Sequence, residues 1–239
     1  MNYKIEAPPM KRNNILVFDV ETTGLLPRKP RGSIAPIPIS EYPHIIQLSF
    51  ALYDVNNKSL IRSYDSYVKI EKTVVIGEYV SKLTGITNEI CNNKGNDIMD
   101  VLKNLHDAYT ECDVIVAHNI DFDEKMVLVE IERNREQIIN KAPECMTLFN
   151  KLYEQVNGLT RYCTMRKGTT LCNIMSTTSV AGRPPSLKWP KLVELYAKLF
   201  TGEIVDGMHN SMVDVLACLR CYLQMRHNSD IGYLTLEYK

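Results

Sequence analysis

The stretch "ILVFDVETTGL", from Ile15 to Leu25, decides the fold that the sequence predicts. Its first half is apolar and rich in β-branched and aromatic residues, with little alternation, which indicates a strand covered on both faces. Two acidic residues, Asp19 and Glu21, stand at the end of this strand. Because residues two apart in a strand point to the same side, their carboxylates are expected to project together. The pair is either two solvated surface charges or a site that needs a proton, a basic partner or a divalent cation.

Two further aspartates occupy similar settings later in the chain. Asp123 in "HNIDFD" and Asp214 in "HNSMVD" each stand near the start of an expected helix, five residues after a histidine. Helix starts favour carboxylates for structural reasons, and Ser211 with Asp214 fits a capping box. A helix would turn His209 about 140° away from Asp214, so the two converge only if His209 precedes the helix. A histidine in that loop is suited to act as a general base.

The segments around the first strand predict an α/β protein with a mixed sheet. "HIIQLSFALYD" and "SLIRSYDSYVKI", joined by "VNNK", have the pattern of an antiparallel hairpin. Helices are expected in "GEYVSKLTGITNEI", "NDIMDVLKNLHDAYTECD", "IDFDEKMVLVEIERNREQI", "KWPKLVELYAKLF" and "NSMVDVLACLRCYLQMRH", and strands in "DVIVAHN" and near Arg161 to Thr164. We therefore expect three antiparallel strands, then parallel ones, with helices on both faces. Sites in such folds lie outside the strand ends, where Asp19, Glu21 and His118 would meet.

A proline-rich and basic segment, Leu26 to Pro43, interrupts this order. It contains five prolines and the cluster Arg28, Lys29 and Arg31, so we expect a loop without a helix or a central strand. Its length is typical of a functional flap. If the ligand of this protein is a nucleic acid, we expect this loop to contact its backbone, because cationic contacts to phosphates dominate non-specific affinity.

The composition is that of an ordinary globular protein. The 239 residues are enough for one substantial core, so we expect one domain over 1–239, with an N-terminal extension at 1–14 and a C-terminal tail at 228–239. No apolar run is long enough to span a bilayer, and prolines and charges stand where a signal peptide would need an apolar run. We therefore expect an intracellular protein, cytoplasmic or nuclear, without a membrane partner.

The charge balance argues against a strongly basic protein that binds polyanions over its whole surface, and the cysteine usage argues against a disulfide framework. The 28 basic and 28 acidic residues cancel, so there is no global attraction for a polyanion. The seven scattered cysteines indicate reduced thiols, and the pair Cys218 and Cys221 fits helix packing better than zinc or redox chemistry. A polyanion would have to be bound by local basic patches, for which the candidates are Lys11, Arg12, Arg28, Lys29, Arg31, Arg161, Arg166 and Lys167.

Three blocks, "FDVETTGL", "AHNIDFD" and "HNSMVDV", resemble in order and spacing the motifs of the DEDDh (DnaQ-like) superfamily of 3′-to-5′ exonucleases. This group contains the proofreading epsilon subunit of bacterial DNA polymerase III. The resemblance extends to "TGIT" at Thr84, to "YCTM" at Tyr162 and to "KWPKLVELYAKLF", and so covers Ile15 to Gln224. The histidine with four residues before Asp214 matches the histidine branch, not the branch with tyrosine.

The resemblance implies a ribonuclease H-like fold and hydrolysis of phosphodiester bonds from a 3′ end with two Mg²⁺ or Mn²⁺ ions. It implies that Asp19 bridges both ions, that Glu21 and Asp214 complete the site of the ion that binds the attacking water, and that Asp123 supports the second. His209 would accept the proton of that water.

The same resemblance assigns the terminal nucleotide to Thr22, Thr23, Gly24, Leu25, Thr84 and Phe122. A nucleotide could stack on Phe122, although an apolar residue there fits a core position equally well. His118 and Asn119 are expected to orient the "FD" turn by hydrogen bonds. Two departures, Gln47 in "IIQL" where many relatives have an acidic residue and Thr84 where many have histidine, leave the sugar preference open.

Three functions are therefore weighed. The first is a 3′-to-5′ exonuclease acting on DNA, of the proofreading or repair type, whose partners would be single-stranded or frayed 3′ ends and a polymerase. The second is an exoribonuclease that trims RNA or short oligonucleotides, because the same carboxylates would serve it. The third is a catalytically silent module that binds ends or a partner, and the intact set of Asp19, Glu21, Asp123, His209 and Asp214 counts against it.

Overall fold

A five-stranded mixed sheet forms the centre of the computed structural model, which describes residues 13–29, 31–32, 34–177 and 186–232. Its order is β3-β2-β1-β4-β5. Strands β1 to β3 are antiparallel neighbours, and β4 and β5 continue the sheet from β1 in parallel. The predicted α/β architecture, three antiparallel strands followed by parallel ones, is confirmed. The strands are β1 (Asn14–Thr22), β2 (Ile45–Asp54), β3 (Ser59–Tyr67), β4 (Val114–Ala117) and β5 (Thr160–Cys163).

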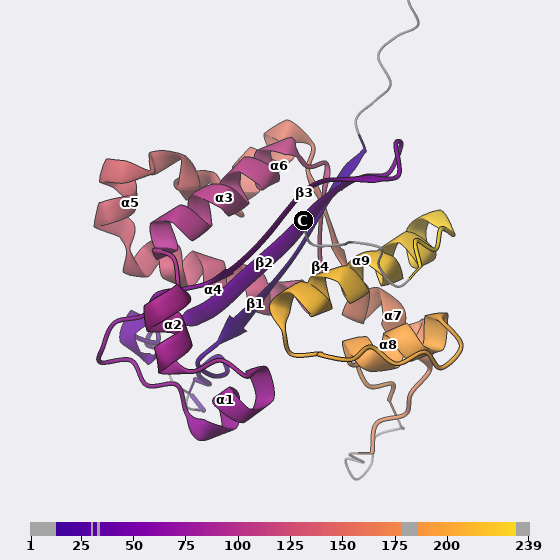
Figure 1. Cartoon of the computed structure of the whole chain (residues 1–239), viewed down its shortest axis with the longest axis horizontal. Coiled ribbons are helices and arrows are strands. Elements are labelled where there is room, and N and C mark those ends of the chain that lie inside the picture. The colour runs from indigo at the N-terminus through magenta and orange to yellow at the C-terminus, as the bar shows by residue number, and fades with distance from the viewer. Residues whose placement is uncertain (1–12, 30, 33, 178–185, 233–239) are drawn as a thin grey trace, which may run out of the picture.

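Strand β1 is buried on both faces, as its unbroken apolar run predicts. Leu16, Phe18 and Val20 pack in a core with the helices α3 (Ile98–Glu111) and α4 (Ile120–Arg133). Ile15 and Val17 pack on the opposite face with α8 (Leu192–Leu199) and α9 (Ser211–His227). Figure 1 shows these two helical layers on either side of the sheet. Because side chains alternate along a strand, Asp19 and Glu21 share the side that faces α9.

Several predicted helices are divided. "GEYVSKLTGITNEI" forms two short helices because Gly85 adopts a left-handed φ of 74° at the end of the first, and Thr87 caps the second. The long predicted helix after β4 ends at Arg133, where Asn134 donates its amide to the Glu130 carbonyl. These and the helices that the sequence did not predict are α1 (Glu78–Thr84), α2 (Asn88–Lys94), α5 (Arg135–Lys141), η2 (Pro143–Thr147), α6 (Lys151–Asn157) and α7 (Thr164–Cys172).

The hairpin between β2 and β3 is confirmed, but an aspartate organises its turn. The Asp54 carboxylate accepts hydrogen bonds from the backbone N–H groups of Asn56 (2.8 Å) and Asn57 (3.0 Å). Lys58 then takes a positive φ of 52°. An Asx-type turn of this kind competes well with continued strand pairing, which fixes the point where the chain reverses.

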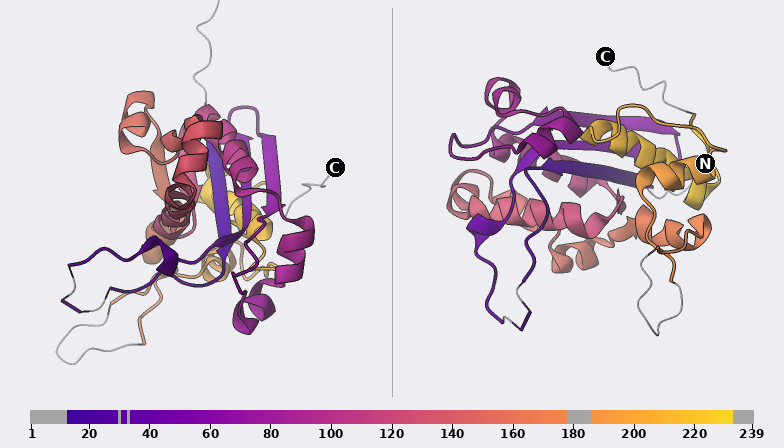
Figure 2. Two further views of the ribbon diagram at one scale, coloured as in Figure 1. Left: turned by 90° about the vertical axis from the view of Figure 1, so that its left-hand side faces the viewer. Right: turned by 90° about the horizontal axis from the view of Figure 1, so that it is seen from below.

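The described parts of two segments project to the same side of the molecule (Figure 2). The first arm joins β1 to β2 and is described at residues 26–29, 31–32 and 34–43, and the second arm joins α7 to α8 and is described at residues 173–177 and 186–190. The first arm contains a short 3-10 helix, η1 (Ile39–Glu41), so the expectation of a loop without any helix was wrong at that point. The foot of the second arm is a narrow ribbon, in which Lys188 N donates to the Ile174 carbonyl over 2.9 Å. Among the helices that the described ranges contain, none has both the length and the apolar character needed to cross a bilayer.

Candidate active site

The carboxyl end of β1 carries the two acidic residues with which the sequence argument began. Asp19 lies opposite Ser49 of β2, and Glu21 lies opposite Gln47. The pairing register shifts directly after Glu21, and β1 ends one residue later at Thr22, which lies opposite Ile45. The strand therefore holds both carboxylates on a rigid support, at the edge of the sheet that the carboxyl ends of its parallel strands form.

Asp123 reaches this edge from the first turn of α4. The helix starts after Asn119, whose left-handed φ of 72° turns the chain sharply at the end of β4. The Asp123 side chain is buried, and its Oδ1 accepts a hydrogen bond of 3.2 Å from the Val20 backbone N–H, between Asp19 and Glu21. The tight turn after β4 therefore places a third carboxylate directly against the end of β1.

Asp214 and His209 come from the start of α9. His209 lies before the helix in an exposed loop, as predicted, with a positive φ of 69°. Its backbone N–H donates to Asp214 Oδ2 over 3.3 Å. The predicted capping box of Ser211 with Asp214 is wrong, because Asn210 is the N-cap and accepts from the N–H groups of Met212 and Val213. The Asp214 carboxylate is thereby left to face the site.

Ser211 ties the start of α9 to β1. It is fully buried, and its hydroxyl donates to the Asp19 carbonyl over 2.7 Å. Its backbone N–H donates to Gln47 Oε1 over 3.3 Å, and Gln47 Nε2 donates to Asp65 Oδ1 over 2.8 Å. Gln47 is only 1% exposed, so its amide supports the site from within. Sequence reasoning missed this support, and only the departure of Gln47 from the family pattern marked the position.

The four carboxylates disturb one another strongly. Burial raises the pKa of Asp19 well above its usual range, and the charges of Asp123, Asp214 and Glu21 raise it further. Burial and then the Asp214 charge raise the pKa of Glu21 to about 8. Burial raises the pKa of Asp123 well above its usual range against a hydrogen bond from Val20 N–H, and raises that of Asp214 to about 7 against one from His209 N–H. At neutral pH the set cannot be fully ionised without a compensating cation.

A divalent cation fits this donor set. Asp214 Oδ1 is buried and has no hydrogen-bond partner among the described residues. Ligand atoms of Glu21, His209 and Asp214 all lie within 4.8 Å of one another, close enough to share one ion. Carboxylate oxygens are the ligands that magnesium and manganese prefer. His209 is thus within reach of the ion as well as of a water beside it.

The segment after Glu21 uses its two threonine hydroxyls internally. Thr22 is buried, and its hydroxyl donates to the Gly24 carbonyl over 2.6 Å. Thr23 pairs with His44, which donates its N–H to the Thr23 hydroxyl over 3.0 Å and accepts from Thr23 N–H over 2.9 Å. Leu25 is 85% exposed, and a Cβ added to Gly24 would meet no atom within 4 Å. The open surface for a ligand at this segment is therefore the Gly24 backbone and the Leu25 side chain.

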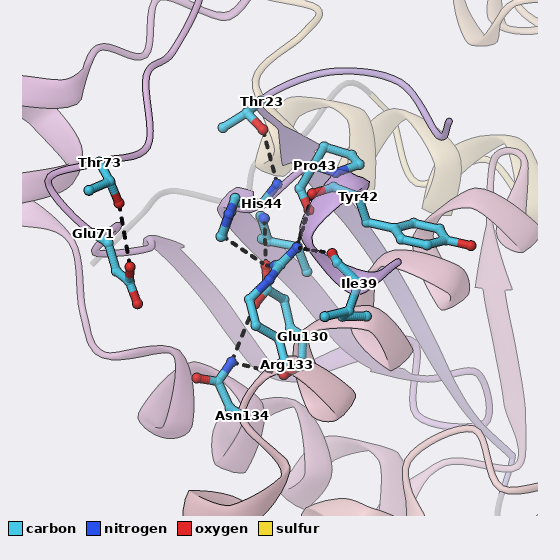
Figure 3. A network of polar contacts seen from close by, with 11 residues as sticks. Thr23, Ile39, Tyr42, Pro43, His44, Glu71, Thr73, Glu130, Arg133 and Asn134 are labelled. Atoms are coloured by element: carbon cyan, nitrogen blue, oxygen red, sulfur yellow. Dashed lines mark hydrogen bonds and ion pairs between the residues drawn. The ribbon is translucent and has the colours of Figure 1, made fainter. Parts of the chain in front are cut away.

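A buried ion pair on α4 fixes the return of the first arm into β2 (Figure 3). Arg133 forms an ion pair with Glu130 and donates from Nη2 to the carbonyls of Tyr42 (3.0 Å) and Pro43 (3.1 Å). Glu130 Oε1 also accepts from the Ile45 N–H over 3.1 Å. Since the next residue toward the arm, His44, pairs with Thr23, this ion pair also holds the segment after Glu21 in place.

The remaining residues of the sequence-predicted set have local roles. The Thr84 hydroxyl donates to the Val80 carbonyl and accepts from Ile86 N–H, which closes the end of α1. Phe122 is half-buried and packs against the core. His118 does not orient the "FD" turn directly, because its ring bonds to Thr164 Oγ1 and to the Pro190 carbonyl, each over 3.0 Å.

The basic patches differ in availability. Arg28, Lys29 and Arg31 are exposed on the first arm and form no ion pair with any residue of the described ranges. Arg161 is neutralised by Glu124 and Glu154, and Arg166 by Asp121. Lys11 and Arg12 lie outside the described residues. Of the two predicted patches that the structure describes, the first arm therefore carries the larger unpaired positive charge.

The chain is similar in sequence to two kinds of bacterial protein. It is 26% identical over 159 residues to a DNA polymerase III PolC-type of Pediococcus pentosaceus, covering 66% of this chain and 10% of that protein. It is 28% identical over 142 residues to the 3′-5′ exonuclease DinG of Bacillus subtilis, covering 58% of this chain and 13% of that protein. The chain thus spans only a small part of the length of these relatives.

Solved structures share the fold. Exonuclease I of E. coli, in complex with a dT13 oligonucleotide, matches with a TM-score of 0.60 and 17% identity over 90% of this chain and 42% of that chain. Exonuclease I from Methylocaldum szegediense matches with a TM-score of 0.58 and 19% identity over 91% of this chain and 41% of that chain. The predicted ribonuclease H-like architecture is confirmed.

A family model extends the match across the whole sheet and its helices. The model, described as Exonuclease (RNase_T), matches residues 16–222. This range contains the three sequence blocks in their predicted order and every acidic residue that converges at the end of β1. The chain therefore belongs to the RNase_T exonuclease family.

Proposed function

We propose that this chain is a 3′-to-5′ exonuclease that removes the terminal nucleotide of single-stranded DNA with the help of two Mg²⁺ or Mn²⁺ ions. The observation that carries the proposal is the convergence of four carboxylates from β1, α4 and α9, with the buried and unpartnered Asp214 Oδ1 among them. An exposed histidine stands beside the same carboxylates. A purely structural cluster would not leave four acidic groups facing one another without basic partners.

In this proposal Asp19, Glu21, Asp123 and Asp214 would hold the ions, which when bound would lower the pKa of a water and offset negative charge on the phosphate. His209 accepts the proton of the attacking water as its oxygen bonds to phosphorus and the bond from phosphorus to the 3′ oxygen breaks. The products are a nucleoside 5′-monophosphate and a strand that is one nucleotide shorter and ends in a 3′ hydroxyl.

The terminal nucleotide would rest on the segment after Glu21. The Gly24 backbone is open to close approach, and the exposed Leu25 side chain offers an apolar surface to the base. Thr22 and Thr23 would shape this surface through their internal hydrogen bonds, with their hydroxyls already engaged. Thr84 would act on the nucleotide only indirectly, because its hydroxyl closes α1, whereas the half-buried Phe122 packs against the core and keeps part of its ring exposed.

The test is degradation of end-labelled single strands of one sequence, made as DNA and as RNA, with Mg²⁺ and with EDTA. We expect DNA to shorten stepwise from the 3′ end and EDTA to stop the reaction. Degradation of RNA with DNA spared would favour the exoribonuclease. Binding of both strands without cleavage of either would favour the silent module.

The polymerase relatives support a proofreading or repair setting as the substrate context. A primer with a mismatched 3′ end frays and presents a single strand, whereas a matched primer does not. We expect the mismatched terminus to be removed faster than the matched one on the same template. Equal rates on both would leave single strands as the substrate and remove the proofreading hypothesis.

A further inference from the structure

Trp189 stands exposed at the foot of the second arm, on a backbone that is fixed on both sides. It is the only tryptophan of the chain, and 63% of its surface is exposed. The residue before it, Lys188, donates its N–H to the Ile174 carbonyl across the ribbon over 2.9 Å. The residue after it, Pro190, is buried, and its carbonyl lies 3.0 Å from His118 Nε2. The indole is therefore carried by a rigid support.

The hydrogen bond to His118 places Trp189 at the edge of the sheet where the candidate active site lies. His118 directly follows β4, which runs parallel to β1 as its neighbour. The two strands end at the same edge, so the bonded Pro190 carbonyl lies at the edge that also carries Asp19 and Glu21. The helix that begins two residues after His118 delivers Asp123 to the site. One hydrogen bond thus links the foot of the second arm to the support of a predicted metal ligand.

The chemistry around Trp189 suits a nucleic-acid strand. Single exposed apolar side chains are common on protein surfaces and carry little information by themselves. Here the exposed Lys191 stands two residues after Trp189, Lys188 is paired with Glu194, and the half-exposed Met175 lies on the facing strand of the ribbon. Bases stack on such aromatic platforms with little dependence on sequence, and nearby cations contact the phosphates. The first arm, which carries Arg28, Lys29 and Arg31, projects to the same side of the molecule (Figure 2).

We propose that Trp189 stacks on a base of the substrate strand upstream of the terminal nucleotide, so that the foot of the second arm is a nucleobase subsite. This inference rests on the proposed exonuclease function, because it assigns the position of a strand whose 3′ end lies at Asp19. The subsite holds the strand and leaves the reacting phosphate to the carboxylates. It therefore acts on binding rather than on the chemical step.

The sole tryptophan gives this subsite its own signal. The cleavage-deficient Asp19→Asn variant is titrated with oligo(dT), and the tryptophan emission is recorded beside the fluorescence anisotropy of a labelled strand. We expect emission to be quenched along the same binding curve that anisotropy gives. Binding seen by anisotropy with unchanged emission overturns the subsite while the proposed function stands. No binding by anisotropy to any strand removes the proposed substrate itself.

Steady-state cleavage separates stacking from folding and chemistry. For Trp189→Ala we expect KM for a long single strand to rise about tenfold with kcat changed less than about twofold, the loss of one stacked base. Trp189→Phe keeps a ring and should stay within about threefold of the wild type, whereas Trp189→Leu, which is apolar but not flat, should resemble alanine. Leu152→Ala removes a comparably exposed apolar side chain on α6 and serves as the matched control.

Substrate length gives a second readout that a general loss of stability would not produce. The p-nitrophenyl ester of thymidine 5′-monophosphate has no upstream base, so its KM should be the same in the wild type and in Trp189→Ala. An equal loss on this ester and on the long strand, or a leucine variant as active as phenylalanine, contradicts the proposal.

Discussion

Burial of carboxylates beside one another dominates the candidate site at the level of single residues. Burial is the largest cause of the raised pKa of Asp19, and the charges of Asp123, Asp214 and Glu21 raise it further. Two of these neighbours have a hydrogen-bonded support, which is the Val20 N–H for Asp123 and the His209 N–H for Asp214. These hydrogen bonds fix the positions of the carboxylates but do not cancel their charge, so the cluster destabilises the folded protein when no metal ion is bound.

Asp19→Asn should separate stability from activity. An amide of the same shape removes a charge from the cluster, so we expect the metal-free variant to melt a few degrees above the wild type near pH 8, about 1 kcal/mol or more. Cleavage should be abolished, because in the proposed mechanism Asp19 would be shared by both ions and no other residue could replace it. The control is Asp121→Asn. Asp121 lies on the first turn of α4, which also carries Asp123, and it pairs with Arg166 at the surface, so this change should alter neither the melting temperature nor cleavage.

His209→Ala distinguishes a general base from a ligand. As a base, His209 should contribute at least about 10²-fold to kcat, and its loss should leave the affinity for Mn²⁺ within a few-fold. The affinity is measured by calorimetry on the same sample. A parallel collapse of rate and Mn²⁺ affinity would assign His209 to the metal, which its position within 4.8 Å of Glu21 and Asp214 permits.

At the level of elements, the contacts that matter join segments far apart in the sequence. The end of α4 holds the first arm through Arg133, and the end of β4 holds the second arm through His118. Both arms are long, yet their feet are fixed by hydrogen bonds to the helix and strand ends around the site. Replacing Arg133 and replacing His118 therefore test two separate predictions.

Arg133→Ala should loosen the first arm and destabilise the protein. It leaves Glu130, a buried carboxylate, without its partner, which typically costs about 3–5 kcal/mol. We expect lower stability in urea and a raised KM with a smaller change in kcat, because Thr23 is held through His44. Arg135→Ala removes an exposed pair with Glu132 at the same spacing and should be nearly silent.

The double variant Glu130→Gln with Arg133→Ala provides the check on that interpretation. Removing both charges should recover much of the stability lost by the single arginine variant, since no buried charge remains unpaired. KM should stay raised, because the donors to Tyr42 and Pro43 are still missing. Losses that simply add in the double variant would contradict a coupled pair.

His118 should make stability fall in mild acid. Burial lowers the pKa of His118 to about 4, whereas an unfolded histidine has its ordinary value of 6.5. The unfolded chain therefore takes up the proton first, so this contribution to stability is complete above pH 6.5 and is lost as the pH falls toward 4. His118→Gln keeps a donor for Pro190 without titrating. Between about pH 7 and about pH 5 the wild type should lose about 2 kcal/mol more than this variant in urea unfolding.

For the whole molecule, metal and pH should act together. The carboxylates of Glu21 and Asp214 have raised pKa values of about 8 and about 7 in the fold, so they favour the folded state while protonated and oppose it as the pH rises toward 8. A bound cation reverses this effect. Saturating Mg²⁺ should therefore raise the melting temperature more near pH 8 than near pH 5, where protons compete for the same oxygens. A larger effect near pH 5 would contradict the carboxylate site.

Because the protein has no net charge, we expect the local basic residues of the arms to bind a polyanion. The net formal charge is zero, and two of the arginines outside the arms, Arg161 and Arg166, are paired with acidic residues. Arg28, Lys29 and Arg31 of the first arm form no ion pair with any described residue, and the exposed Lys191 at the foot of the second arm forms none either. Affinity for single strands should accordingly depend on a few local contacts.

The sequence by itself predicted the antiparallel and then parallel strands of a mixed sheet, the burial of β1 and the family, and it proposed the five residues of the candidate site, because these depend on periodicity and on short motifs that a chain carries locally. It did not determine how helices divide at Gly85 and Asn134, since these breaks depend on single backbone conformations. Only the tertiary structure decided the support of the site. Ser211 meets Asp19 across 192 residues of chain, and Gln47 meets Ser211 across 164. No local pattern encodes such pairs, because their hydrogen bonds form only when packing of α9 on the sheet excludes water from both partners.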